Sequence, residues 1–372
     1  MVLTPANIAS YLIESGLVTP ESILEGDFLV AEVIRRNRSF KVIRQKHPAY
    51  FVKQVRKWDA MSISTLQREG HCYQLTNQQG DFAPLAALMP RFHRFDTNRS
   101  ILITELLHGA ENLSEYHLRY GVFPMDVGKQ LGEAFGRYHQ RVKANTYDGS
   151  LASVFPRAVP WILTVHQNQL QLFNALSAGN HQLLALIGKY PDIGNRLAEL
   201  RAEWQVTALI HGDIKWDNCL LDTSASNGTA ALKIIDWELA DWGDPCWDIA
   251  AVFTQYLVYW IQSMPFHSAA DPATLVERAG FPLERMQPAI QVFWNAYARA
   301  MEMSREEEGA LLRRSTRYCG ARMIQTAYEY LQFSPQVNAL ALYLLQASLN
   351  ILTQPDEAIQ ELLGIPTRWM KS

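Results

Sequence analysis

Asp213, Asn218 and Asp236 are the residues of this 372-residue chain whose types and spacing best fit a chemical role. They occur in HGDIKWDNCLLDTSASNGTAALKIIDWELAD, residues 211–241, where two apolar runs flank a loop rich in Ser, Asn, Gly and Thr. This pattern predicts a β-hairpin, with Asp213 and Asn218 before its first strand and Asp236 at the end of its second. Because an antiparallel hairpin brings its open ends together, the three polar side chains should lie near one another.

This set fits the transfer of a phosphoryl group from a nucleotide. That reaction needs oxygen ligands for Mg²⁺, a carboxylate beside the attacking hydroxyl, and cations against the phosphates. Asn218 and Asp236 can supply oxygen to Mg²⁺, and Asp213 can act as the base without binding the metal. Each residue alone is more simply explained as a turn residue. The joint pattern favours the chemical role, because its order and spacing are rare by chance.

The composition indicates a globular protein without an overall attraction to nucleic acid or membrane. Hydrophobic residues make up 48% of the chain, and the net charge is only −3. The two long stretches without charged residues, 249–270 and 330–355, contain Gln, Ser and Pro, which favours buried helices over membrane spans. The four cysteines form no C-x-x-C pair, and the N-terminus lacks the pattern of a signal peptide. We therefore expect a cytoplasmic protein with neither a nucleic-acid nor a membrane partner.

The pattern of apolar residues changes from strand-like to helical along the chain. An apolar stripe predicts a helix over residues 4–16, and after Gly109 most segments have helical spacing. Between them, β-branched and aromatic runs predict strands at 28–34, 40–45 and 50–55, and two more within 91–107, with one helix at 63–77. The fold class is therefore α+β. The predicted division is a helical extension at 1–25, a nucleotide-binding, sheet-rich lobe at 26–107, and a helical lobe with the catalytic loop and acceptor site at 108–372.

HGDIKWDNCLL…KIIDWELADWGDPCWDIA resembles the Brenner-type segment of the aminoglycoside phosphotransferase and choline kinase family, a branch of the protein-kinase-like fold. The family pattern has three parts, all present here: H-G-D-x4-N, an I-D-[WF]-E strand end, and a G-D-P-x-x-D-[IL]-A tail. The resemblance implies a two-lobed kinase-like fold and a phosphoryl donor that is ATP, with GTP as the alternative. It implies that Asp213 is the catalytic base, that Asn218 and Asp236 bind Mg²⁺, and that Asp248 is a buried carboxylate bracing the catalytic loop.

The resemblance also implies a nucleotide site in the first lobe. Lys53 in YFVKQV has the place of the strand lysine that contacts the α- and β-phosphates, and Glu69 on the next helix has the place of its partner. Either residue alone is more simply explained as a solvated side chain, and only the two together, in this order, favour a nucleotide site. Backbone groups of Glu105 to Leu107, in ILITELLHG, would hydrogen-bond the adenine edge.

LGEAFGRYH, ending at His139, matches a scaffold helix of the family.

The turn that should cover the phosphates departs from the kinase pattern, because VIRRNRSFKV contains no glycine. Asn37 and Ser39 can form a tight turn there and offer N–H or hydroxyl donors to the nucleotide. Arg35, Arg36 and Arg38 can add positive charge. The alternative is a solvated basic hairpin tip.

Lys215 follows Asp213 by two residues, where serine/threonine protein kinases carry a lysine in H-R-D-x-K-x-x-N. By that resemblance it neutralises the γ-phosphate beside the attacking hydroxyl, which is an electrostatic part of catalysis. The alternative is a surface lysine on the loop.

The sequence leaves the acceptor open. Acidic residues near the motif (Glu238, Asp241, Asp244) and at 306–308 could meet a polycation, although a G-D-P turn and a helix start explain most of them. Arg313 and Arg317 share one face of a predicted helix, and Arg314 lies beside them. This face is either solvated or able to hold an anionic substrate or an acidic peptide.

Three functions remain. The first is a kinase for a hydroxyl of a small molecule such as an aminoglycoside, a choline-like alcohol or a sugar. The second phosphorylates Ser or Thr of a ribosomally made precursor peptide, ahead of elimination by a companion lyase. The third, a non-catalytic nucleotide-binding regulator, is disfavoured because Lys53, Asp213, Asn218 and Asp236 are all present.

Overall fold

The computed structural model describes residues 1–34, 36–77, 80–144, 154–167, 176–222, 230–266 and 271–366, except for the side chain of Ile34. The described residues divide into two compact units. The first contains residues 1–115, 154–155 and 216–240, and the second contains residues 116–144, 156–215 and 241–366. The first unit is therefore discontinuous in sequence, because the segment with the predicted hairpin returns to it. The functional boundaries at residues 25 and 107 stay predictions.

A five-stranded antiparallel sheet forms the centre of the first unit. Its strands are β1 (Leu29–Ile34), β2 (Arg38–Ile43), β3 (Tyr50–Gln54), β4 (Phe92–Asp96) and β5 (Ile101–Glu105). They lie in the order β1-β2-β3-β5-β4. All five strands were predicted from their β-branched and aromatic residues.

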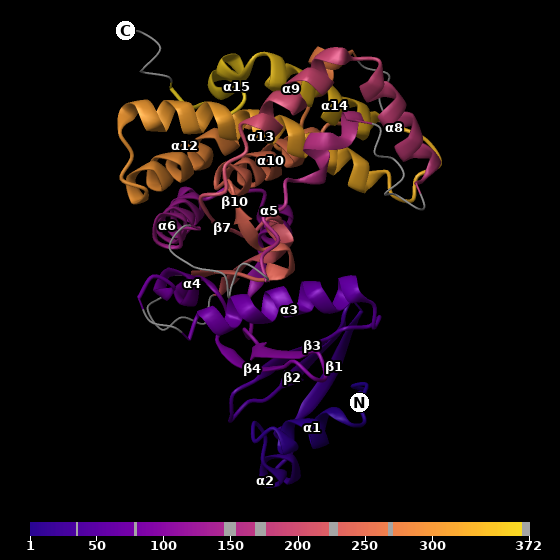
Figure 1. The fold of residues 1–372 in the computed structure, drawn as a ribbon, viewed down its shortest axis with the longest axis vertical. Helices are drawn as coiled ribbons and strands as arrows, with labels where there is room; N and C mark the ends of the chain where they lie inside the picture. Colours follow the sequence, from indigo (N-terminus) through magenta and orange to yellow (C-terminus); the bar gives the residue numbers. More distant parts are fainter. Residues whose placement is uncertain are drawn as a thin grey trace. The chain divides into compact units, whose positions relative to one another are not determined.

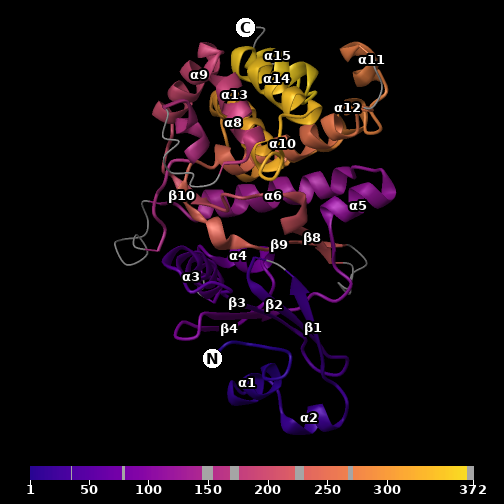
Figure 2. The ribbon, with the colours of Figure 1, turned by 90° about the vertical axis from the view of Figure 1, so that its right-hand side faces the viewer.

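Helices cover both faces of this sheet (Figures 1 and 2). On one face lie α1 (Ile8–Glu14) and α2 (Pro20–Leu24), and on the other α3 (Ala60–Leu75). Because side chains alternate along a strand, Val52 faces α1 in a core with Tyr11 and Phe40, whereas Lys53 faces α3. The sheet thereby places the lysine opposite the helix that carries Glu69.

The predicted hairpin is confirmed as β8 (Cys219–Asp222) and β9 (Ala231–Ile234), which pair from Cys219 opposite Ile234. Most of its loop lies outside the described residues. A two-residue strand that was not predicted, β6 (Glu111–Asn112), adds a third strand beside β8. Helix α4 (Ala83–Leu88) packs near β9, and the Nζ atom of Lys233 donates to the carbonyl oxygen of Ala87 at 2.9 Å. The hairpin is thus an integral part of the first unit.

The second unit is mainly helical, and α5 (Leu113–Tyr120) spans the boundary between the units. The other helical elements are α6 (Met125–Arg141), η1 (Trp161–Gln167), α8 (Ala178–Gly188), α9 (Pro191–Ala202), α10 (Cys246–Gln262), α11 (Pro272–Glu277), α12 (Leu283–Ala300), α13 (Arg305–Tyr330), α14 (Ala339–Thr353) and α15 (Pro355–Glu361). The antiparallel strands β7 (Ala208–Ile210) and β10 (Asp241–Gly243) form a short ribbon, and both were missed because each has only three residues.

The predicted scaffold helix α6 packs closely against α12 (Figure 1). Gly128, Gly132 and Gly136 recur every four residues and so lie on one face of α6. A Cβ atom at Gly132 would lie only 2.2 Å from the carbonyl oxygen of Phe293, so this face tolerates no side chain. The glycines permit a close approach of the two helices that any larger residue would prevent.

The architecture confirms the predicted class, an α+β protein-kinase-like fold with an antiparallel sheet in the N-terminal part and a mostly helical remainder. Within the described part of the chain, no helix combines the length and the hydropathy needed to cross a membrane. All four cysteines are buried free thiols.

Candidate active site

Lys53, Glu69 and Asp236 come together in the first unit; the pairing of Lys53 with Glu69 was predicted, and the contact of Lys53 with Asp236 was not. The Nζ atom of Lys53 lies 2.7 Å from Oε2 of Glu69 and 2.6 Å from Oδ1 of Asp236. Strand β3 aims the lysine at α3, and Glu69 reaches it from the buried face of that helix. One ammonium group therefore joins the sheet, its covering helix and the end of the hairpin.

Burial and charge act in opposite directions on this cluster. Burial raises the pKa of Glu69 to about 7, and the nearby ammonium of Lys53 only partly offsets that effect. Burial alone would lower the pKa of Lys53, but the carboxylates of Glu69 and Asp236 outweigh it and raise the pKa above its ordinary value. Lys53 is therefore a fixed positive charge at neutral pH.

Asn218 and Asp236 flank the paired part of the hairpin. The 3₁₀ turn η3 (Trp216–Asn218) ends at Asn218, whose carbonyl oxygen accepts the N–H of Ile235 at 3.0 Å. Asp236 follows directly in a left-handed conformation with φ of 68°, before the short helix η4 (Trp237–Leu239). A non-glycine residue at positive φ is uncommon and turns the chain sharply. The two polar residues therefore stand on adjacent ends of one hairpin.

This donor set fits Mg²⁺. The amide of Asn218 and the carboxylate of Asp236 offer hard oxygen atoms, and the Asp236 side chain is 38% exposed. Among the described residues, no group of three or more His, Cys, Asp or Glu is arranged to hold a metal ion. A magnesium site with one or two protein ligands does not need such a group, because phosphate and water complete the coordination.

Strand β2, which follows the covering turn, places Ser39 beside the lysine. Ser39 lies opposite Lys53 in the β2–β3 register and is buried. Its Oγ atom has no hydrogen-bond partner within the part of the chain that the structure describes, so it retains the capacity to contact a ligand. Asn37 is also buried. Arg36 pairs at 3.0 Å with Glu238, which partly neutralises its charge, and Arg35 lies outside the described residues.

The segment predicted to contact adenine continues from β5. The N–H of Glu105 donates to the carbonyl oxygen of Arg91 at 2.8 Å, and the N–H of Leu106 donates to that of Ala49 at 3.0 Å. These two donors are therefore occupied within the sheet. The contact with adenine would have to use other groups, namely the carbonyl oxygen of Glu105 and the N–H of Leu107, and it stays a prediction.

The HGD segment belongs to the second unit, where it follows β7. Asp248, in the first turn of α10, accepts the N–H of His211 at 2.7 Å and the N–H of Gly212 at 3.0 Å. The hydroxyl of Tyr138 donates to the same carboxylate at 2.5 Å, and the His139 ring lies 3.4 Å from it. The bracing role expected for Asp248 is confirmed by these contacts, and the scaffold helix α6 supplies two of its partners.

Asp248 is charged although it is completely buried. Burial alone would raise its pKa, but hydrogen bonds from His139 and Tyr138 outweigh burial and lower the pKa to about 2. Burial lowers the pKa of His139, so this ring is neutral at pH 7. The carboxylate is thus an anionic acceptor that fixes the backbone before Asp213.

Asp213 and Lys215 form an ion pair in the same loop. The Nζ atom of Lys215 lies 3.3 Å from Oδ1 of Asp213 and 3.3 Å from Oε2 of Glu329, which α13 supplies. Burial would lower the pKa of Lys215, but these two carboxylates outweigh burial and raise it. The N–H of Asp213 also donates to Nδ1 of His211 at 3.2 Å. Lys215 is thus held by two acids, unlike a freely solvated surface lysine.

Sequence reasoning missed the contribution of α13 to this loop. The carbonyl oxygen of Gly212 accepts hydrogen bonds from Nε1 of Trp247 at 3.1 Å and from Nη1 of Arg322 at 3.3 Å. The Arg322 guanidinium also lies over the Trp247 ring, 4.7 Å from its centroid. The helical spacing predicted α13, but nothing in one sequence indicates which of its charges turns inward.

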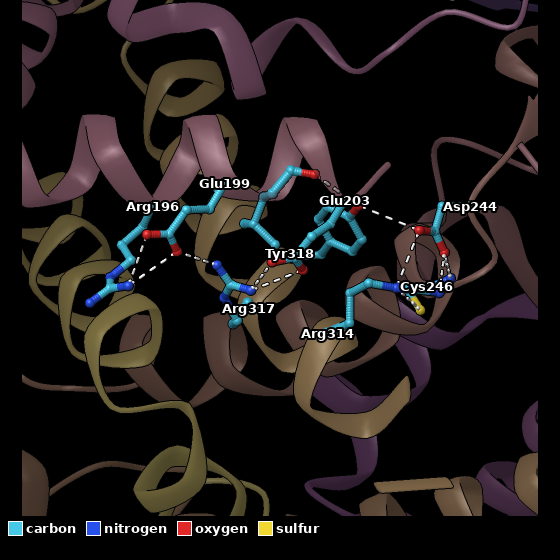
Figure 3. A network of polar contacts seen from close by, with 9 residues as sticks. Arg196, Glu199, Glu203, Asp244, Cys246, Arg314, Arg317 and Tyr318 are labelled. Atoms are coloured by element: carbon cyan, nitrogen blue, oxygen red, sulfur yellow. Dashed lines mark hydrogen bonds and ion pairs between the residues drawn. The ribbon is translucent and has the colours of Figure 1, made fainter. Parts of the chain in front are cut away.

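The arginines considered for an anionic substrate are paired within the second unit, and Figure 3 shows two of them, Arg314 and Arg317. Arg317 contacts Glu203 and Glu199, each at 2.7 Å, and its side chain is only 13% exposed. Arg314 contacts Asp244 at 3.3 Å and Cys246 at 3.2 Å, and Arg313 pairs with Asp356. Arg313 is exposed, as the solvated alternative predicts, whereas Arg314 and Arg317 are largely covered and paired with acids of the same unit.

The acids considered for a cationic acceptor also have structural partners. Asp241 accepts the N–H groups of Arg157 and Ala158 at 2.7 and 2.8 Å. Ser304 and Glu307 form a capping box at the start of α13. Asp244 accepts the N–H of Cys246 at 3.0 Å, as its turn predicts.

The comparisons with known proteins agree with this geometry. The model of the phosphotransferase enzyme family matches residues 34–287. Among solved structures, the protein APH(2")-IIa in a ternary complex with streptomycin and ATP is 14% identical, with a TM-score of 0.51, over 93% of this chain and 99% of that one. A glucosamine kinase in complex with glucosamine, ADP and inorganic phosphate is 15% identical, with a TM-score of 0.51, over 97% and 88%.

A choline kinase from Streptococcus pneumoniae is also similar, at 15% identity and a TM-score of 0.46, over 92% of this chain and 98% of that one. The search of curated proteins finds no match. Because the family model covers more than half of its length, the chain belongs to the phosphotransferase enzyme family.

Proposed function

We propose that this protein transfers the γ-phosphoryl group of ATP to a hydroxyl group of a small molecule, in the presence of Mg²⁺. The observation that carries the proposal is the pairing of one largely covered lysine, Lys53, with two carboxylates, Glu69 and Asp236, at 2.7 and 2.6 Å. Such a lysine is fixed in place and positively charged, as the binding of nucleotide phosphates requires. Family membership supports the class of reaction.

In the proposed reaction, the first unit binds the nucleotide. Lys53 contacts the α- and β-phosphates, and Glu69 keeps its ammonium in position. Ser39 and Asn37 donate to the phosphates from the covering turn, and backbone groups of Glu105 and Leu107 bind the adenine. The side chains of Asn218 and Asp236 hold Mg²⁺, which neutralises charge on the phosphate oxygens when it is bound.

The second unit activates the acceptor. Asp213 takes the proton of the acceptor hydroxyl, whose oxygen forms a bond to the γ-phosphorus. The bond between that phosphorus and the oxygen bridging to the β-phosphate breaks, and ADP leaves. Lys215 neutralises the charge that develops on the transferred group. Asp248 supports the reaction indirectly, because it fixes the backbone of His211 and Gly212.

The test is direct phosphorylation with Mg-ATP. The panel contains streptomycin, glucosamine, choline and related amino alcohols, neutral sugars, and Ser- or Thr-containing peptides encoded by neighbouring genes. Mass spectrometry should detect the gain of one phosphoryl group by a small molecule, and Asp213→Asn should abolish that gain. Phosphorylation of a peptide alone would replace the small-molecule proposal with the precursor-peptide kinase and its companion lyase. Nucleotide binding without transfer to any acceptor or to water would indicate a regulator.

A further inference from the structure

Two charged residues of α13 reach the catalytic loop, residues 211–215. Nη1 of Arg322 lies 3.3 Å from the carbonyl oxygen of Gly212, and Oε2 of Glu329 lies 3.3 Å from Nζ of Lys215. The two residues are about two turns apart on the helix, so they share one face. One helix therefore contacts the loop just before and just after Asp213.

Arg322 is buried, and that position is costly for a guanidinium unless its donors are used. Its contacts are the Gly212 carbonyl oxygen and the face of Trp247. Trp247 donates to the same carbonyl oxygen through Nε1. Because that carbonyl belongs to the peptide bond between Gly212 and Asp213, two donors fix the plane from which Asp213 projects. Asp248 fixes the preceding N–H groups, so the loop is held from both sides.

Glu329 is itself held in place. Gln325, one turn earlier on α13, donates from Nε2 to Oε1 of Glu329 at 3.0 Å. The other carboxylate oxygen faces Lys215, which also contacts Asp213. A lysine side chain has many rotamers, and losing that freedom opposes a single fixed position. Two carboxylates at equal distance supply the attraction that selects one position for the ammonium.

We propose that α13 positions the catalytic loop, with Arg322 fixing the Gly212–Asp213 peptide and Glu329 holding the ammonium of Lys215 beside Asp213. The inference rests on the proposed phosphoryl transfer. Arg322 and Glu329 act through the loop and are positioning residues. Glu329 determines the position of the Lys215 ammonium. Arg322 determines the direction in which the Asp213 side chain projects from the loop.

The kinetic test is a double-mutant cycle with Glu329→Gln and Lys215→Ala. The probe is the release of ADP from Mg-ATP with water as the acceptor, so no acceptor needs to be known. Glu329→Gln should lower kcat about 10-fold, leave the KM for ATP within about twofold, and have no further effect in the Lys215→Ala protein. Glu361→Gln, which removes an exposed acid at the end of α15, is the matched control and should change neither constant. Equal effects of Glu329→Gln with and without Lys215 would overturn the assignment.

The pH profile separates positioning from a general loss of structure. Lys215 is faced by the carboxylates of Asp213 and Glu329, which favour its charged form, and by Arg322, which opposes it. Removal of the Glu329 charge should therefore move the alkaline limb of kcat to lower pH. A limb that stays in place while kcat falls would contradict an action through Lys215.

A second readout does not depend on catalysis. Amide hydrogen exchange should become faster in the peptide covering residues 211–215 in Arg322→Met and Glu329→Gln, with unchanged melting temperatures. Unchanged exchange in both variants would reject the positioning role. If the wild-type protein transferred the phosphoryl group neither to water nor to any acceptor, the proposed function would fail, whereas the exchange result would still decide whether α13 holds the loop.

Discussion

Nζ of Lys53 and Oδ1 of Asp236 lie 2.6 Å apart, although 183 residues separate them in the chain. Both belong to the first unit, so the contact depends on the return of the hairpin to that unit. Asp236 thereby links the end of the hairpin to the lysine of the five-stranded sheet. Loss of either partner should affect nucleotide binding as well as turnover.

Replacement of Lys53 by Met should lower turnover about 100-fold or more, because a fixed donor to the phosphates is lost. It should also leave Glu69 without its cationic partner, so that this buried carboxyl binds a proton more readily. Steady-state kinetics with Mg-ATP measure the loss. Lys41→Met is a suitable control, because Lys41 lies on the next strand, on the same face of the sheet, but is exposed. Comparable losses in both variants would contradict a specific role for Lys53.

Asp236→Ala should weaken the binding of Mg-ATP by about 10-fold or more in calorimetric titrations, because the proposed metal ligand is lost. Without Mg²⁺ the variant and the wild type should differ much less, which separates a metal role from general damage to the site. Asp213→Ala should have the opposite profile, with nucleotide affinity within a few-fold and no transfer. A magnesium-independent loss of affinity in Asp236→Ala would argue against the metal role.

Gly132→Ala should reduce the free energy of unfolding by about 1–3 kcal/mol, because overpacking forces two closely packed helices apart. The added Cβ would meet the carbonyl oxygen of Phe293 at 2.2 Å. Chemical denaturation measures the change. Gly188→Ala, at the end of α8, has nothing within 4 Å of the added atom and should not destabilise the protein. If both variants unfolded alike, the α6–α12 contact would not depend on its glycines.

The Asp248 carboxylate should make stability depend on pH under acidic conditions. Its pKa falls from an ordinary 3.8 to about 2 on folding, so the unfolded chain binds the proton more tightly. The contribution, roughly 2 kcal/mol, is present above pH 3.8 and is lost as the pH falls through 2. The stability difference between the wild type and Asp248→Asn should therefore narrow between pH 5 and pH 2.5. Urea denaturation at several pH values tests this expectation, and a constant difference would contradict it.

Local patterns predicted much of the fold and part of the site. The alternation in YFVKQV predicts strand β3 and implies that Lys53 and Val52 face opposite sides. The hairpin pattern predicts that Asn218 and Asp236 stand at its open end. The roles assigned to these residues in binding and catalysis stay predictions.

Long-range packing explains what the sequence could not supply. Whether Arg322 or Arg317 turns toward the loop depends on which neighbours surround each face of α13, and periodicity does not reveal this. The pairing of Arg317 with Glu203 joins residues 114 positions apart. The strands β7 and β10 are too short for an alternating pattern to emerge, and their pairing with each other defines them.

The discontinuity of the first unit constrains how this protein can be recombined with its relatives. Truncation after residue 115 would remove β8 and β9 and leave β6 without the strand beside it. It would also remove Asp236 from Lys53. A chimaera that exchanges the first unit must therefore transplant separate gene segments, above all residues 1–115 and 216–240, and a library with a single crossover point would yield mismatched halves.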